Sequence, residues 1–162
     1  MGGCCLSSPW VLYLAKVVTK ELTTAIDISA SPQMVWQILT DFPAYEQWNP
    51  FIRSISGTAV QGSQLTAYIH PPGGQGMTFK PTVLIAEPER EFRWLGRFLV
   101  PGLFDGKHRF QIEAREDDQV RFIHSEKFSG LLVPLLATSL DTKVREGFEA
   151  MNQALKARAE GA

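Results

Sequence analysis

The stretch LATSLDTKVREGFEAMNQAL, residues 136–155, decides the fold class. Its apolar residues recur every three or four positions, with polar residues between them: Leu136, Leu140, Val144, Phe148, Met151 and Leu155. This period is typical of an amphipathic helix, and Pro134 and Gly161 suit its beginning and its end. We expect one helix over Leu135–Ala159, about 37 Å long at 1.5 Å per residue.

Upstream of this helix the chain reads as a series of strands. Six strand-like runs are separated by turns rich in Gly, Pro or Asp: Ile52–Ser56, Gln64–His70, Thr78–Glu87, Glu91–Phe98, Phe104–Glu116 and Gln119–Phe128. A seventh run, Thr24–Ala30, precedes two short helices that begin near Ser31 and Asp41. Because the connections are short, the sequence predicts an α+β fold with a seven-stranded curved antiparallel sheet wrapped around the C-terminal helix.

One helix cannot cover such a sheet. Seven strands spaced by about 4.8 Å span some 30 Å, whereas a helix with its side chains covers about 10–12 Å. We therefore expect a cavity between the sheet and the C-terminal helix. Strand alternation and the helical stripe give the candidate ligand-binding residues: Trp48, Phe79, Trp94, Phe98, Phe104, Phe110, His124, Phe128, Phe148 and Met151.

Two candidate catalytic residues share this face. A hairpin that pairs Glu116 with Val120 would pair Phe110 with Glu126, and would place His108 diagonally across from Glu126. An imidazole beside a carboxylate in an apolar pocket is suited to general acid–base chemistry. The alternative is that the two side chains only satisfy each other's hydrogen bonds, as buried polar groups must.

A metal site built from His108, His124 and Glu126 is the other possibility on this wall. No spacing typical of zinc ligands occurs in the sequence. We therefore expect no metal, and no motif indicates any other cofactor.

Five motifs, together with the order of the predicted elements, resemble the SRPBCC superfamily. They are Ser31-Pro32-x-x-Val35-Trp36, Asp41-Phe42-Pro43-x-Tyr45-x-x-Trp48-Asn49-Pro50-Phe51, Phe104-x-Gly106-x-His108-x-Phe110, Glu126-x-Phe128-x-Gly130 and Phe148-x-x-Met151-Asn152-x-Ala154-Leu155-Lys156. The resemblance covers roughly residues 22–160 and is greatest to small bacterial proteins often labelled polyketide cyclase or dehydratase. It implies a START-like helix-grip fold with a ligand cavity, here a domain over residues 22–162, and it implies no particular reaction.

Residues 1–21 read as an N-terminal appendage. The apolar run Pro9–Val18 contains Lys16 and is much shorter than the roughly 20 residues that span a bilayer. Cys4 and Cys5 could carry acyl chains, so we expect a membrane partner only if this segment is an anchor. The alternatives are a start codon upstream of the true one, or a segment packed on the domain.

The amino-acid composition limits the classes of partner that we expect. Sixteen Lys and Arg against seventeen Asp and Glu leave no basic excess, so we expect no nucleic acid partner. Two adjacent cysteines form no disulfide framework, which suits the cytoplasm. We expect the domain to bind a hydrophobic or amphipathic small molecule. The alternatives are a cyclase- or dehydratase-type enzyme that uses His108 and Glu126, and an interaction module whose exposed sheet face binds a protein; the oligomeric state stays open.

Overall fold

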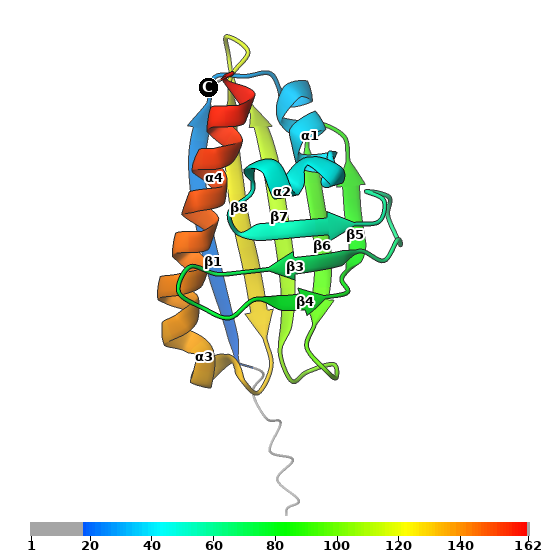
Figure 1. Cartoon of the computed structure of the whole chain (residues 1–162), viewed down its shortest axis with the longest axis vertical. Helices are drawn as coiled ribbons and strands as arrows, with labels where there is room; N and C mark the ends of the chain where they lie inside the picture. Colours follow the sequence, from blue (N-terminus) through cyan, green and yellow to red (C-terminus); the bar gives the residue numbers. More distant parts are fainter. Residues whose placement is uncertain (1–17, 162) are drawn as a thin grey trace, which may run out of the picture.

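The structure, a computed structural model, describes residues 18–161 of the chain (Figure 1). The predictions for residues 1–17, which include Cys4, Cys5 and all of the apolar run except Val18, lie outside the described residues. The first strand, β1, spans Thr19–Ile28. Residues 19–21, which the sequence analysis assigns to the appendage, are therefore paired with another strand.

The main sheet has five antiparallel strands in the order β1-β8-β7-β6-β5. After β1 its members are β8 (Val120–Ser129), β7 (Asp105–Ala114), β6 (Glu91–Arg97) and β5 (Thr82–Glu87). Burial alternates along β7 and β8, so one face of the sheet is turned to the core and the other to solvent. This concave face carries the residues of interest.

A second sheet crosses in front of the first (Figure 1). It has three antiparallel strands: β2 (Ile52–Ser56), β3 (Thr66–Ile69) and β4 (Met77–Phe79). The predicted strand Thr78–Glu87 is divided between the two sheets, because Pro81 follows β4 and a proline has no N–H to donate to a strand ladder. The described part of the chain thus has eight strands in two sheets where the sequence predicts seven in one.

Two short helices close the upper end of the domain in Figure 1. Helix α1 (Pro32–Thr40) begins as predicted, with the Ser31 hydroxyl accepting the backbone N–H of Met34 at 3.2 Å. A 3₁₀ turn over Phe42–Ala44 leads into α2 (Tyr45–Trp48). The side chains of Leu39 and Tyr45 are fully buried, so packed side chains close this end of the domain.

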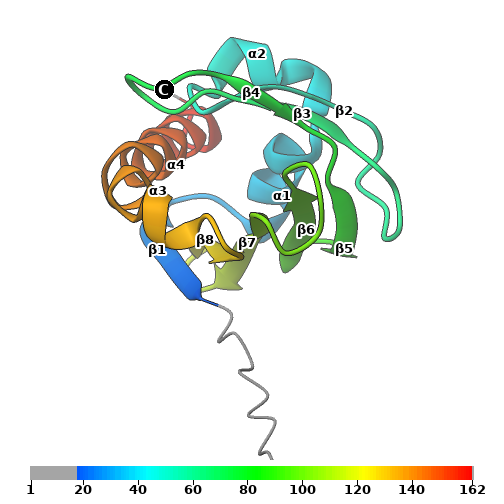
Figure 2. The same ribbon diagram turned by 90° about the horizontal axis from the view of Figure 1, so that it is seen from below.

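The C-terminal helix is continuous but changes its winding. It begins as α3 (Val133–Ser139), passes through a π-helical turn, η2 (Leu140–Val144), and continues as α4 (Arg145–Ala159). Phe148, Met151 and Leu155 of α4 are fully buried against the sheet. Seen from below, the helix and the two sheets surround a common interior (Figure 2). The α+β helix-grip architecture predicted from the sequence is confirmed.

Candidate functional site

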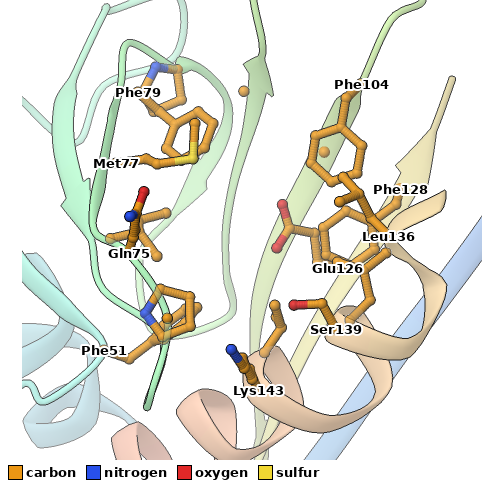
Figure 3. A pocket seen from close by; sticks show the side chains of 18 of the residues that line it. Phe51, Gln75, Met77, Phe79, Phe104, Glu126, Phe128, Leu136, Ser139 and Lys143 are labelled. Atoms are coloured by element: carbon orange, nitrogen blue, oxygen red, sulfur yellow. The ribbon is translucent and has the colours of Figure 1, made fainter. Parts of the chain in front are cut away.

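A cavity of about 310 Å³ lies between the two sheets and the start of the C-terminal helix, and Figure 3 shows the side chains that line it. The start of this helix, α3, is at the lower end of the domain in Figure 1, away from α1. The volume of the cavity is at the small end of the roughly 300–1,000 Å³ that small-molecule sites usually have. The apolar part of the wall comes from both sheets and from the start of the C-terminal helix: Phe51, Ile69, Pro71, Met77, Phe79, Pro81, Trp94, Phe104, Phe128, Leu136, Leu140 and Val144. The polar side chains on the wall are Gln75, Glu126, Ser139 and Lys143.

Two glycines explain why this end is hollow. Gly96 of β6 and Gly106 of β7 are directly paired, and both line the cavity. Their neighbours on the same face, Trp94 and His108, carry large rings. A Cβ built on Gly96 would meet nothing closer than the Gly106 carbonyl oxygen at 3.9 Å. The pair itself therefore supplies no side chain to fill the space above it, and the space above Gly96 stays open.

Glu126 occupies the wall beside Gly106. A Cβ added to Gly106 would lie 2.1 Å from Oε1 of Glu126, so any larger residue would displace the carboxylate. The carboxylate faces the cavity in Figure 3. Lys143, which also lines the cavity, donates from Nζ to the carbonyl oxygen of Gly73 at 2.9 Å. The cavity thus has one acidic and one basic side chain in an otherwise mostly apolar wall.

Behind Glu126, buried polar side chains form a chain of contacts. Glu126 Oε2 lies 3.1 Å from His108 Nδ1, and His108 Nε2 lies 2.6 Å from His124 Nε2. His124 Nδ1 lies 3.1 Å from Asn152 Oδ1, and Asn152 Nδ2 donates to Thr24 Oγ1 at 2.9 Å. Both histidines are completely buried, whereas the Glu126 side chain is 15% exposed. The carboxylate is therefore the point at which this chain reaches the cavity.

The contact between His108 and Glu126 differs from the others. The two atoms are within ion-pair distance, but His108 Nδ1 has no partner aligned with its ring N–H direction. It is therefore a close contact and not a hydrogen bond, because a hydrogen bond also needs alignment.

Burial shifts the protonation of His124. Desolvation lowers its pKa well below the ordinary value of 6.5, and the neighbouring His108 lowers it further. The contacts with Asn152 and with the backbone of Phe148 oppose this shift but do not overcome it. The ring also stacks on Phe148, with centroids 3.7 Å apart and planes 8° apart. His124 is therefore a neutral ring near pH 7 that is stacked on Phe148.

The predicted register of the β7–β8 hairpin is wrong. Ala114, not Glu116, pairs with Val120, so His108 lies directly opposite Glu126 and Phe110 opposite His124. The turn is responsible, because Asp117 and Asp118 both adopt positive φ angles and reverse the chain one position earlier than predicted. In the observed register the two candidate catalytic residues are directly opposite each other, and so closer than in the predicted diagonal arrangement.

The predicted ligand-binding residues separate into two groups. Four of them line the cavity, namely Phe79, Trp94, Phe104 and Phe128. The others lie away from its wall: Phe110, His124, Phe148 and Met151 are buried in the packed core, Trp48 is half-buried on α2, and Phe98 is half-buried after β6. Alternation identifies the concave face correctly, but the cavity occupies only the lower part of that face.

Several site residues were missed by the sequence analysis. Thr24 and Asn152 complete the buried chain, and Ser139 and Lys143 line the cavity. A signal for the hollow was present, since Gly96 and Gly106 have the same strand parity as Trp94 and His108. The sequence places His108, His124 and Glu126 on one wall, but it does not show that Thr24 of β1 and Asn152 of α4 extend the polar chain, because these elements are far apart in the sequence.

The histidine pair is not arranged for metal binding. Its Nε2 atoms are 2.6 Å apart, whereas an ion between them would need about 2.0–2.1 Å to each nitrogen. Within residues 18–161, no group of three or more His, Cys, Asp or Glu side chains is placed to hold a metal ion.

The fold and this cavity define a helix-grip domain. Residues 19–160 match the polyketide cyclase / dehydrase and lipid transport family, and the chain belongs to it. Comparison with curated protein sequences gives no match. None of the helices in the described part of the chain is both long and apolar enough to cross a membrane.

Solved structures share the fold at low sequence identity. A START superfamily protein from Mycobacterium smegmatis is 23% identical with a TM-score of 0.70, and the match covers 87% of this chain and 97% of that one. The Zhui aromatase/cyclase from Streptomyces sp. R1128 is 13% identical with a TM-score of 0.72, covering 88% and 94%. Norcoclaurine synthase from Thalictrum flavum is 12% identical with a TM-score of 0.68, covering 98% and 96%. Because these identities are low, the likeness establishes the START-like fold and not a shared reaction.

Proposed function

We propose that this domain binds a hydrophobic or amphipathic small molecule in the cavity between its sheets and its C-terminal helix. The observation that carries the proposal is the mostly apolar cavity of about 310 Å³ with one carboxylate on its wall. An apolar body would be desolvated by the aromatic wall, and a polar end would face Glu126 or Lys143. The family's name, which includes lipid transport, agrees with such a ligand.

A fluorescent dye tests the cavity directly. The neutral dye N-phenyl-1-naphthylamine should bind the full chain and gain fluorescence, since it would leave water for an apolar wall. Gly96→Leu should lower its affinity at least tenfold, because the new side chain would occupy the open space above the Gly96–Gly106 pair. Arg97→Leu is the matched control, since the next residue along β6 is exposed on the outer face.

Thermal melts of the three proteins separate binding from folding. We expect Gly96→Leu to melt no lower than the unmodified chain, because a Cβ there meets no atom closer than 3.9 Å and glycine is a weak strand former. Equal dye affinity in Gly96→Leu and the unmodified chain would refute the proposed cavity. Native mass spectrometry of the protein from its own host would then identify any ligand that it retains.

Acid–base catalysis of the cyclase or dehydratase kind is the second candidate. One observation favours it: the Glu126 carboxylate lines the cavity and touches the buried His108 ring. Such a pair can give a proton to a bound ligand or take one from it. The ring contacts of His108 with Trp94 and Phe148 keep it apart from water, which strengthens its interaction with charge.

A retained ligand allows this second candidate to be tested. If the pair catalyses dehydration, the ligand's mass should decrease by one water in the presence of the unmodified protein. His108→Gln should slow that change at least a hundredfold and leave the ligand's affinity within about threefold, because general acid–base groups act on the transition state. An unchanged rate in His108→Gln would remove the enzyme hypothesis and leave the binding function intact.

We also propose a cytoplasmic location, supported by the absence of a cysteine framework in the sequence. Cell fractionation tests this proposal together with the anchor hypothesis. The unmodified chain should remain in the supernatant, whereas a membrane fraction that is lost on Cys4→Ser and Cys5→Ser would indicate acylation.

A further inference from the structure

Four exposed leucine and valine side chains lie at the lower end of the domain. They are Leu99, Val100, Leu131 and Leu135, and they are between 58% and 79% exposed. They come from the β6–β7 loop, from the β8–α3 loop and from α3, all at the lower end in Figure 1. Such a cluster of exposed apolar side chains is typical of a surface that has a partner, and we call it the mouth surface.

A backbone hydrogen bond joins the two loops of the mouth surface. The N–H of Leu131 donates to the carbonyl oxygen of Gly102 at 3.1 Å. The stretches 98–104 and 130–140, which contain the loops and the start of the helix, have no charged residue. The mouth surface therefore belongs to one joined part of the fold, and its own stretches of chain provide no charge that would favour exposure to water.

The mouth surface lies beside the opening of the cavity. Leu136, the next residue after Leu135 on α3, lines the cavity and is itself 38% exposed. Phe104, the last residue of the β6–β7 loop, lines the cavity as well. A chain segment bound to the mouth surface would therefore lie at the edge of the opening.

The described part of the chain begins next to this surface. The carbonyl oxygen of its first residue, Val18, accepts the N–H of Gly130 at 3.3 Å, and Gly130 directly precedes Leu131. The first fifteen residues of the sequence have no charged side chain. Among them, residues 9–15, PWVLYLA, are almost entirely apolar.

We propose that residues 9–15 dock on the mouth surface and cover the opening of the cavity. At up to about 3.3 Å per residue, these residues can lie about 10–30 Å from Val18, so the surface beside Gly130 is within their reach. Their covalent attachment gives an effective concentration in the millimolar range, whereas a separate partner would have to be supplied at that concentration. Because both sides are apolar and uncharged, docking would remove both from water.

A thiol on the mouth surface tests the docking without any ligand. Cys4 and Cys5 are the only cysteines, so both are replaced by serine in the full chain, and Leu131→Cys is added. We expect iodoacetamide to modify this thiol at least fivefold faster when Leu12→Asp and Leu14→Asp are also present, because two carboxylates would keep the segment in water. Mass spectrometry measures the rate of modification.

Two controls separate docking from other effects of the added charge. Ser7→Asp together with Ser8→Asp adds the same charge just outside residues 9–15, and should leave the rate at Leu131→Cys within about twofold. Met34→Cys places a thiol on α1, at the opposite end of the domain in Figure 1, and should react equally fast with either N-terminal sequence. An equal rate at Leu131→Cys with and without the two leucine-to-aspartate substitutions would overturn the proposal.

Other occupants of the mouth surface would give different results. If a second copy of the chain covered it, the protection of Leu131→Cys would disappear on dilution, and the mass in solution would be that of a dimer. If a bilayer covered it, the thiol would be protected only after vesicles of phosphatidylglycerol and phosphatidylcholine are added. Either result would overturn the docking of residues 9–15.

The rate of dye entry tests whether the docked segment covers the opening. N-phenyl-1-naphthylamine should enter the cavity at least threefold faster in the Leu12→Asp, Leu14→Asp variant than in the unmodified chain. Equal entry rates in stopped-flow fluorescence would overturn the cover. This part of the inference rests on the proposed function, because it needs a cavity that binds the dye. Absence of dye binding in both proteins would count against that function, while the thiol measurement would stand.

Discussion

The two ends of the concave face differ although the same strands build both. At the upper end Phe92, Phe110 and Phe122 are completely buried, and the Phe110 ring centroid lies 6.3 Å from that of Phe92 and 6.1 Å from that of Phe122. At the lower end the same three strands carry Gly96, Gly106 and Phe128 around a cavity. Helices α1 and α2 cover the upper end, and within residues 18–161 no such pair of helices lies across the lower one (Figure 1).

The difference shows that strand alternation alone does not locate a ligand site. Alternation tells which side chains face the interior, and the size of those side chains decides whether the interior is filled. The buried polar chain lies at the boundary between the two ends, with Phe110 above His108 and Gly106 below it. The upper end is therefore filled by buried side chains, the lower end contains the cavity, and the polar chain lies between them.

The largest expected effect contrasts two phenylalanines. Phe110→Ala should lower the free energy of unfolding by about 3–5 kcal/mol, because it leaves a void in a packed core. Phe104→Ala, at the half-buried cavity wall, should cost about 1 kcal/mol. Urea denaturation followed by circular dichroism measures both. Equal losses would mean that the lower end is packed as tightly as the upper one.

A smaller effect is expected where the polar chain crosses the boundary. Asn152→Leu should cost about 1–3 kcal/mol, since it deprives both His124 Nδ1 and Thr24 Oγ1 of a buried partner. Gln153→Leu, on the exposed side of the same helix, should stay within about 0.5 kcal/mol. A similar cost for the two variants would show that the contacts of Asn152 contribute nothing measurable.

The pH dependence of stability tests the neutral His124. Its pKa is lowered in the folded protein, so below about pH 6.5 the unfolded chain binds a proton that the folded one does not. Stability should therefore fall as the pH decreases, by about 1 kcal/mol between pH 6 and pH 5.

Variants identify the source of that slope. His124→Phe retains a ring to stack on Phe148 and should flatten the dependence, whereas the exposed His70→Asn should leave it unchanged. Urea unfolding at several pH values measures the slopes. The same slope in His124→Phe as in the unmodified protein would assign the effect to other groups.

The sequence predicts the individual helices and strands well and the tertiary contacts between them poorly. Ser31 caps α1 as expected, and Phe148, Met151 and Leu155 face the sheet, because caps and helical stripes depend on near neighbours. The register of the β7–β8 hairpin depends on the positive φ angles of Asp117 and Asp118. The residue types in the turn do not by themselves specify this register.

The cavity was predicted, but its extent was not. A helix is too narrow to cover the whole sheet, which implies a cavity between them. The alternation of side chains along the strands was enough to place Trp94 and Phe128 on its wall. Leu140 and Val144 both line the cavity and lie in the π-helical turn, which has no clear signature in an apolar stripe of three and four. Such turns depend on tertiary packing, so the helix residues on the cavity wall were identified only from the folded structure.

The smallest expected effect compares two adjacent leucines of α3 at the open end. Leu135 is 79% exposed, while Leu136 is 38% exposed and lines the cavity. Leu135→Gln and Leu136→Gln should each change stability by no more than about 0.5 kcal/mol, because glutamine and leucine have similar helix propensities. Only Leu136→Gln should weaken dye binding, by about two- to fivefold, since it replaces part of the apolar wall with an amide. Dye titrations of both variants measure this. If Leu135→Gln weakened dye binding as much as Leu136→Gln, the dye would be bound by the exposed surface around the opening. The cavity would then not be the dye-binding site.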